Sequence, residues 1–220
     1  KTILLTLDVT KEVIEEAITE NVDLIIAHHP LIFTPIKGIV DDYQGRIIMS
    51  LIKHDITLYI AHTNFDISNY GMDFLLASML KLKDMENLDD ITDNEGLGKI
   101  GEVKQKPMSE YISIVKDTFN LDYARFIGDL TTIVHRVAIS GGSGSSNMFN
   151  AKAKQADLFI TGDVTYHKAL ECKTIGLNVL DVGHHIEHFF IHHLQHILLE
   201  EGITASIKTS KVNTNPYKNV

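Results

Sequence analysis

Histidine is concentrated in two short stretches of this chain. His28 and His29 are adjacent, and six of the twelve histidines fall between His184 and His196. Imidazole nitrogens are frequent ligands of transition-metal ions. The distribution therefore predicts a metal site, and the residues that follow the predicted strands are its candidate ligands.

The pair His28–His29 follows an apolar run and precedes Pro30. Open α/β sheets place their ligands beyond the carboxyl ends of parallel strands. Neighbouring residues of a strand point to opposite faces, so both histidines can share a site only if the strand has ended. Pro30 favours that ending because it restricts His29 to extended or turn geometry. The alternative, a pair of surface histidines at a turn, stays open on this dipeptide alone.

His62 and Asp66 follow the next apolar run. A carboxylate can bridge two divalent ions, so Asp66 is a candidate metal ligand. His62 is a candidate ligand, a hydrogen-bond partner of a ligand, or an acid/base group. The alternative for Asp66 is the N-cap of a helix that starts near Asn69.

His184 and Glu187 follow a third apolar run and open a predicted helix. Residues three apart share one helix face, and imidazole with carboxylate suits Zn²⁺, Fe²⁺ or Mn²⁺. Alternatively, Glu187 only favours the helix N-terminus electrostatically. His185 competes with His184 as the ligand if the helix starts one residue later.

His188, His192 and His196 recur every four residues in the same helix. This face could bind a further metal ion, but a solvated or subunit-facing stripe is the favoured interpretation. The apolar face of the helix is formed by Ile186, Phe190, Leu194 and Ile197.

Two further strand ends supply polar groups. Tyr166 and His167 follow one of them and are candidates for acid/base or substrate contacts. The Gly/Ser turn at 141–146 follows the other, and its backbone N–H groups could face an anion. Because this turn lacks the lysine of a phosphate-binding P-loop, a tight turn without a ligand is favoured.

Apolar runs and helical periodicity alternate along the chain, which favours an α/β fold with mainly parallel sheets flanked by helices. Strands are predicted at 3–7, 23–27, 57–61, 123–127, 134–140, 157–161, 177–181 and 203–208, and helices at 11–20, 43–54, 69–82, 108–119, 147–155, 164–174 and 185–201. Asp8 and Thr10 are the candidate caps of the first helix. The metal ligands are thus expected at the strand ends, between two lobes.

The stretch 83–98 is acidic and polar, so it is predicted to be a linker, a solvated loop, or both. The lobes would then cover 1–88 and 99–220, joined by a linker at 89–98.

Bulk properties restrict the class of protein. The 220 residues are 44% hydrophobic and 22% charged, typical of a globular chain with a core. A net charge of -9 argues against direct nucleic-acid binding, and no apolar run or secretory signal predicts a membrane span or export. Cys172 is the only cysteine, which fits a reducing compartment, so we expect a cytoplasmic protein. The chain starts at Lys1 directly before a strand, so we expect a preceding piece.

Five ordered motifs give the sequence a specific resemblance to a known family. They are LIIAHHPLIF, LYIAHTNFD, VAISGGSGSS, FITGDVTYHKALE and LNVLDVGHHIEH, running from residue 24 to 188. The chain resembles the NGG-interacting-factor-three-like family, whose bacterial members are often named GTP cyclohydrolase 1 type 2 homologues. The order of the family is matched from Lys1 to about Ile207.

The resemblance implies two divalent metal ions, with His28 and His29 each binding one, Asp66 binding or bridging, and His184 and Glu187 completing the site. Relatives with a longer spacing place the glutamate four residues after the histidine, whereas here it is the third. The resemblance also implies two related lobes and a ring-shaped homohexamer. Many relatives carry an inserted domain for which 83–98 leaves no room, and their N-terminal segment looks absent here.

The implied function is a metal-dependent hydrolase that acts on a small, nucleotide-like substrate, in the manner of a GTP cyclohydrolase. His62 or His167 would move protons. The alternative is a metal-binding or metal-handling regulatory scaffold without turnover. The family name suggests a third possibility, a transcriptional adaptor, for which the acidic charge gives no support.

Overall fold

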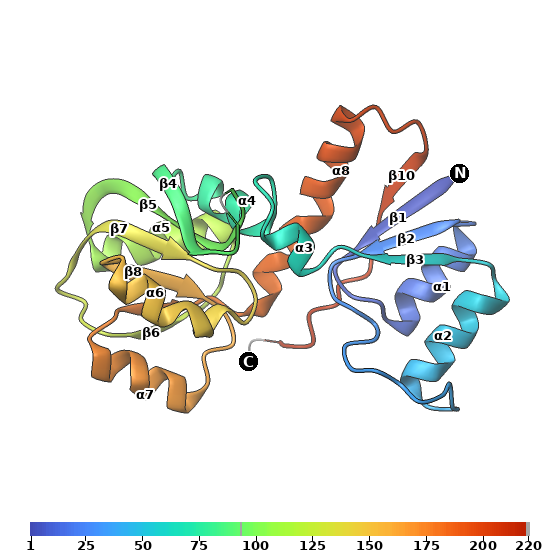
Figure 1. The fold of residues 1–220 in the computed structure, drawn as a ribbon, viewed down its shortest axis with the longest axis horizontal. Helices are drawn as coiled ribbons and strands as arrows, with labels where there is room; N and C mark the ends of the chain where they lie inside the picture. The colour runs from blue at the N-terminus through green and yellow to red at the C-terminus, as the bar shows by residue number, and fades with distance from the viewer. Residues whose placement is uncertain (93, 219–220) are drawn as a thin grey trace. The chain divides into compact units, whose positions relative to one another are not determined.

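The computed structural model describes residues 1–92 and 94–218, which form two compact units (Figure 1). Unit 1 combines Lys1–Thr63 with His188–Lys218, and unit 2 is formed by Asn64–Glu187. The chain therefore passes from one unit to the other after Thr63 and again after Glu187. The predicted lobe boundaries at 88 and 99 stay a prediction.

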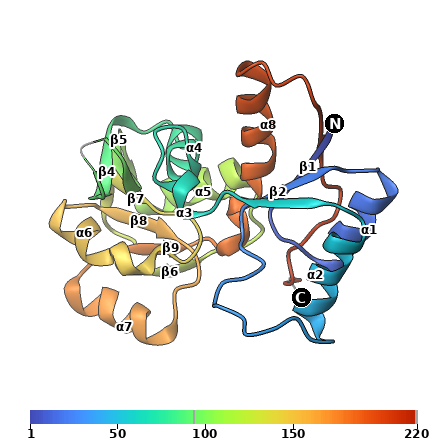
Figure 2. The same ribbon diagram turned by 45° about the vertical axis from the view of Figure 1, so that its right-hand side comes forward.

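Unit 1 is built around a parallel sheet. Its strands, in spatial order, are β10 (Ser206–Thr209), β1 (Thr2–Thr6), β2 (Leu24–Ala27) and β3 (Thr57–Ile60). Its helices are α1 (Lys11–Thr19), α2 (Tyr43–Lys53) and α8 (Phe190–Glu200). Helices α1 and α2 cover one face of the sheet and α8 covers the other, as both views show (Figures 1 and 2). Because both faces are covered, β1 and β2 are apolar runs without alternation.

The register of this sheet brings three strand ends to one level. Ala27, the last residue of β2, pairs with Thr6 of β1 and with Ile60 of β3. Each of these residues also ends its strand. The residues that come next, His28 among them, are therefore presented together at the carboxyl edge.

Helix α1 forms where its cap and its apolar spacing predict it. The side chain of Thr10 accepts a hydrogen bond from the backbone N–H of Val13 at 3.3 Å, so Thr10 is the cap. Val13 and Ala17, four residues apart, are both fully buried against the sheet. Burial of this stripe fixes the helix against the strands that end at the site.

Unit 2 contains a mixed sheet. In spatial order its strands are β4 (Lys83–Asp90), β5 (Gly96–Pro107), β7 (Ile133–Ile139), β8 (Leu158–Thr161), β9 (Val179–Asp181) and β6 (Arg125–Ile127). Strands β7, β8 and β9 run parallel, whereas β4, β5 and β6 are antiparallel to their neighbours. The predicted α/β class is confirmed, with a parallel sheet in unit 1 and a mixed one here.

Helices cover both faces of the second sheet. The helical segments of this part of the chain are α3 (Thr63–Asp66), α4 (Met72–Met79), α5 (Met108–Phe119), α6 (Met148–Ala153), α7 (Tyr166–Ile175) and the 3₁₀ helices η1 (Gly144–Asn147) and η2 (His184–Phe189). Helices α4 and α5 lie on one face and α6 and α7 on the other (Figures 1 and 2). Ala138, Phe159 and Val179 pack in the core on the side of α6 and α7.

The segment expected to be irregular at 83–98 is instead largely a β-hairpin. Strand β4 pairs antiparallel with β5, as with Asp89 opposite Leu97. Most side chains of β4 are exposed or half-buried, and Leu88 is the one that reaches the core. An edge strand that buries so little keeps a polar composition, which is why the sequence suggested a linker. Across the described ranges, helices are too short or too polar to cross a membrane.

Candidate metal centre

Three imidazoles gather at the carboxyl edge of the unit 1 sheet. His28 and His29 follow β2, and His62 follows β3. The ring centroids lie 5.1 Å apart for His28 and His29, 5.2 Å for His28 and His62, and 6.0 Å for His29 and His62. His28 is fully buried, and its ring centroid lies 5.0 Å from that of Phe190. The shared strand ends therefore create one compact group of nitrogen donors.

Hydrogen bonds orient two of these rings. Nδ1 of His28 lies 2.7 Å from the carbonyl oxygen of Ala61, and Nδ1 of His29 lies 2.7 Å from Oδ1 of Asp8. Both oxygens can only accept, so each Nδ1 carries the proton and donates it. The Nε2 atoms are then left with the lone pair that a metal ion takes, which is how ligand histidines are usually held.

Asp8 was expected only as a helix cap, and the structure gives it this different role. It follows β1, where its Oδ1 accepts from His29 and its Oδ2 accepts from the Thr214 hydroxyl. Two donors on one carboxylate fix its position and, through it, the ring of His29. The sequence carried no signal for the contact because Thr214 and His29 are far from Asp8 along the chain.

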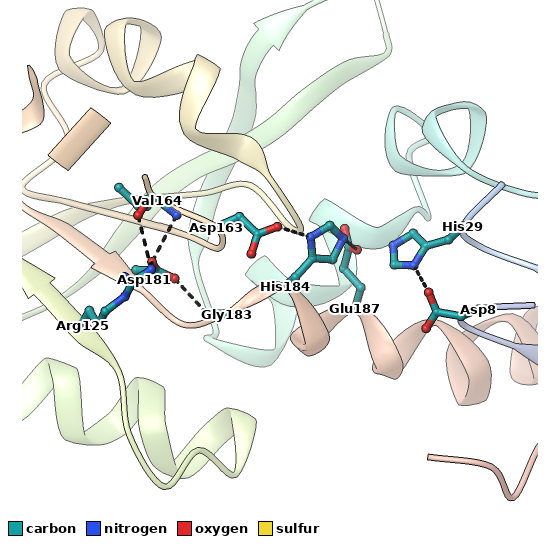
Figure 3. A network of polar contacts seen from close by, with 9 residues as sticks. All are labelled: Asp8, His29, Arg125, Asp163, Val164, Asp181, Gly183, His184 and Glu187. Atoms are coloured by element: carbon teal, nitrogen blue, oxygen red, sulfur yellow. Dashed lines mark hydrogen bonds and ion pairs between the residues drawn. The ribbon is translucent and has the colours of Figure 1, made fainter. Parts of the chain in front are cut away.

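The second group of candidate ligands, His184 and Glu187, lies in unit 2. Both residues belong to η2, which begins shortly after β9, and Nε2 of His184 is 3.0 Å from Oε2 of Glu187 (Figure 3). Because a 3₁₀ helix has three residues per turn, residues three apart lie above one another. The shorter His–Glu spacing of this chain therefore still aligns the two side chains.

Acidic neighbours dominate the electrostatics of His184. Its Nδ1 lies 2.6 Å from Oδ2 of Asp163, on the side opposite Glu187. The pKa of His184 is raised to about 9, chiefly by its hydrogen bond with Glu187 and also by Asp163, while partial burial opposes the rise. Glu187 itself is 5% exposed. A position that holds a proton so strongly between two carboxylates also favours a metal cation.

Asp181, the last residue of β9, holds the two loops that carry these groups. Its Oδ2 accepts from the N–H of Val164 at 3.1 Å, and its Oδ1 accepts from the N–H of Gly183 at 3.0 Å (Figure 3). Val164 follows Asp163, and Gly183 precedes His184. Asp163 adopts a left-handed backbone (φ 52°), a conformation that Asp tolerates better than most residues. The buried Asp181 thus sets where Asp163 and His184 meet.

The turn at 141–146 closes on Glu187. A Cβ atom on Gly142 would lie 2.5 Å from Oε1 of Glu187, and one on Gly141 would lie 3.1 Å from the same oxygen. Gly142 also has a left-handed backbone, with φ at 51°. Glycine is therefore required here by conformation and by close approach to a carboxylate. A role of this turn in holding phosphate stays a prediction.

Asp73 of α4 is a buried carboxylate that sequence patterns did not single out. Its Oδ1 accepts from the N–H of Gly141 at 2.8 Å, and its Oδ2 accepts from the N–H of Gly98 at 2.6 Å. Burial raises the pKa of Asp73 to about 6, and the negative charge of Glu187 adds to the rise, while the two amides oppose it. Asp73 therefore anchors the turn that contacts Glu187.

Asp66 and His167, the two remaining predicted site residues, lie in helices α3 and α7. Asp66 is the last residue of α3, and α4 begins at Met72, so Asp66 is not the cap of the helix predicted at 69–82. His167 lies exposed in the first turn of α7, where its ring centroid is 5.5 Å from that of Tyr166. The ligand role of Asp66 and the catalytic role of His167 stay predictions.

Comparison with known families gives a match over nearly the whole chain. The model of the family described as Duf34/NIF3 (NGG1p interacting factor 3) matches residues 1–216. A protein of Streptococcus pneumoniae named GTP cyclohydrolase 1 type 2 homolog is 37% identical over 227 residues, covering 99% of this chain and 86% of the relative. The protein of that name from Clostridium perfringens is 41% identical over 186 residues, covering 83% and 71%.

Solved structures agree with the family match. A Staphylococcus aureus hypothetical protein has a TM-score of 0.92 at 30% identity, covering 99% of this chain and 87% of its own. A Bacillus cereus protein related to NIF3 has a TM-score of 0.89 at 27% identity, with coverage of 100% and 89%. The relative from Listeria monocytogenes aligns over 330 residues, more than the 220 of this chain, so it contains segments that this chain lacks.

Proposed function

We propose that this chain, which belongs to the Duf34/NIF3 family, holds two divalent metal ions and uses them in hydrolysis. The ligands would be His28, His29, Asp66, His184 and Glu187. The observation that carries the proposal is shared by three histidines. His28, His29 and His184 each have Nδ1 against an oxygen, from a backbone carbonyl in the first case and a carboxylate in the other two. Ligand histidines are commonly held in this way, with Nδ1 hydrogen-bonded and Nε2 on the metal. In His184, Nε2 lies 3.0 Å from Oε2 of Glu187, a second proposed ligand.

Several candidate ligands lie close in sequence to the points where the chain passes between the units. The chain leaves unit 1 after Thr63, between His62 and Asp66, and returns to it directly after Glu187. Candidate ligands therefore lie beside both passages between the units. Asp66 comes shortly after the first passage, and Glu187 is the last residue before the second. His28, His29 and Glu187 each offer a ligand atom of the kind that a metal ion takes.

The donor set indicates the class of ion. Imidazole nitrogen with carboxylate oxygen, and no thiolate, suits Zn²⁺, Fe²⁺ or Mn²⁺. The carboxylates Asp66 and Glu187 would supply the oxygen donors that hold the two ions. Glu187 is buried beside Gly142, which restricts the movement of its carboxylate.

The chemistry proposed is attack of water on an electrophilic carbon or phosphorus of a small, nucleotide-like substrate. Two bound divalent ions would lower the pKa of a water molecule toward neutrality. His62, which is half-buried beside His28, would accept or return a proton. The names of the curated relatives, GTP cyclohydrolase 1 type 2 homolog, make guanine nucleotides the first substrates to test.

A metal-binding regulatory scaffold without turnover is the second candidate. His167, one of the two predicted proton carriers, is exposed in the first turn of α7, and this favours the scaffold because an exposed side chain is not held in a fixed position for proton transfer. For either function, we also propose that the protein assembles into a homohexamer in the cytoplasm. It would make no direct contact with nucleic acid or membrane.

Turnover by the metal-loaded chain separates the two candidates. We expect saturable consumption of GTP, followed by chromatography, that falls at least tenfold in kcat in His62→Ala and is lost in Glu187→Ala. His54→Ala is the matched control, because His54 is an exposed histidine at the end of α2. Metal-loaded wild type that turns over no nucleotide would instead support the scaffold.

A further inference from the structure

Helix α8 presents a pair of histidines on its outer face. It buries Phe190 and Leu194, and it packs against β1 and β10. His192 and His196 each lie two residues beyond one of these buried positions, which at 100° per residue places them on the opposite side of the helix. Both histidines are exposed.

The spacing of His192 and His196 is that of a helical chelate. Side chains four residues apart on a helix are neighbours, with about 5–6 Å between their Cβ atoms. The same spacing lets two histidines of one helix bind a single zinc ion in metalloproteases. Both residues lie within the regular helix, Phe190–Glu200, so the spacing is realised in the structure.

The charge around this pair favours a cation. Glu200 lies one further turn along the stripe, and its Oε1 is 3.3 Å from Nε2 of His196. Glu201 follows directly, and the helix sequence FIHHLQHILLE contains neither lysine nor arginine. A metal ion held by two imidazoles here meets a nearby carboxylate and no positive residue of its own helix.

We propose that His192 and His196 form a separate surface site for one late first-row divalent cation, with the negative charge of Glu200 beside it. Cu²⁺, Ni²⁺ and Zn²⁺ are the ions that two imidazoles take in preference to Mn²⁺ or Mg²⁺. The site shares no residue with the proposed dinuclear centre, so it stands independently of the proposed function. It goes beyond that function by giving the protein a place to capture a metal ion at its surface.

Titration of the untagged full chain with Ni²⁺, followed by calorimetry, tests the site. We expect His192→Ala and His196→Ala each to weaken one Ni²⁺-binding event at least tenfold and the double variant to lose it. Alanine is the best helix former and both positions are exposed, so these variants should keep the fold, which circular dichroism checks. Unchanged Ni²⁺ stoichiometry and affinity in the double variant would overturn the proposal.

Two controls separate this site from the rest of the protein. His54→Ala changes an exposed histidine at the end of α2, and it should leave this Ni²⁺-binding event unchanged. Glu187→Ala should remove ions of the proposed dinuclear centre while the α8 ion still binds. Loss of the α8 ion in His54→Ala to the same extent as in His192→Ala would contradict the assignment.

Discussion

The two groups of candidate ligands differ in chemistry and in how they are held. The unit 1 group is made of imidazoles at the ends of parallel strands, and its best-buried member, His28, is oriented by a backbone carbonyl. The unit 2 group is acidic, with Glu187 and Asp163 on either side of His184 and with Asp73 behind the glycine turn. Unit 1 thus supplies nitrogen donors, whereas unit 2 supplies most of the negative charge.

This difference explains what each unit must do to keep its ligands ready. Neutral rings at strand ends are held at little electrostatic cost, so a sheet edge is sufficient. Carboxylates brought near one another repel, and burial makes their charge more costly. Unit 2 therefore needs glycine turns, buried amide donors and the ring of His184 to stabilise its group.

The largest effect is expected from crowding the unit 2 group with Gly142→Ala. The new Cβ would lie 2.5 Å from Oε1 of Glu187 in a left-handed backbone, so we expect a loss of about 4 kcal/mol in the free energy of unfolding. Gly183→Ala is the matched control, since Gly183 is also left-handed but has open space around its Cβ position. It should cost about 1–2 kcal/mol in urea unfolding. Equal losses of unfolding free energy in the two variants would show that the close approach to Glu187 does not affect stability.

The second effect concerns charge, through Asp73→Asn. Burial raises the pKa of Asp73 from 3.8 to about 6, so the folded state favours the neutral carboxyl. Its contribution to stability is present below about pH 4 and is lost as the pH rises through 6. At about 1.4 kcal/mol per pKa unit, this change is about 3 kcal/mol. Asp73→Asn should remove this fall from the unfolding free energy measured between pH 4 and 7.

Asp129→Asn serves as the control for that pH series. Hydrogen bonds from Thr131 hold the pKa of the exposed Asp129 below its usual value, the opposite direction to Asp73. The wild-type fall in stability between pH 4 and 7 should therefore persist in Asp129→Asn. If Asp73→Asn kept the same fall, the buried carboxylate would not be its source.

The smallest effect is expected on metal affinity, when the carboxylate that orients a histidine is removed from either unit. Asp8→Ala should weaken metal binding through His29, and Asp163→Ala through His184, each by about 10–100-fold in competition with a chelating dye. The reason is that each change frees a ring that its carboxylate had oriented. A matched change elsewhere, Asp129→Ala, should leave the affinity unchanged. Loss in only one of the two variants would show that one unit binds metal without the other.

Sequence reasoning found the strand ends and the parts of the site that adjoin them. Apolar runs placed most strands within one to three residues of their observed bounds, and His28, His62 and His184 each come within three residues of a strand end. It failed at β4 and β5, because a hairpin that buries mainly Leu88 and Ile100 has the composition of a loop. The antiparallel pairing of β4 with β5 could not be predicted from the sequence for the same reason.

The orienting residues were missed for a different reason. Asp73 lies 68 residues from Gly141, and Asp8 and Asp163 each lie 21 residues from the histidine that they orient. Such contacts depend on how helices and strands pack, so the spacing of residues in the sequence does not predict them. Carboxylates near helix starts also have an ordinary local role as caps, which hid the contact of Asp8 with His29.

The most direct test of the central claim is the metal content of the chain purified without chelator, measured by elemental analysis. We predict two divalent ions per chain in wild type, a lower content in Asp66→Ala and Glu187→Ala, and no change in Glu171→Ala, whose carboxylate pairs with Lys168 on α7. Measuring the metal content of His192→Ala as well shows whether an ion bound at α8 contributes to the wild-type value. A chain that holds no metal and takes up none at the dinuclear ligands from added Zn²⁺, Mn²⁺ or Fe²⁺ would contradict the account.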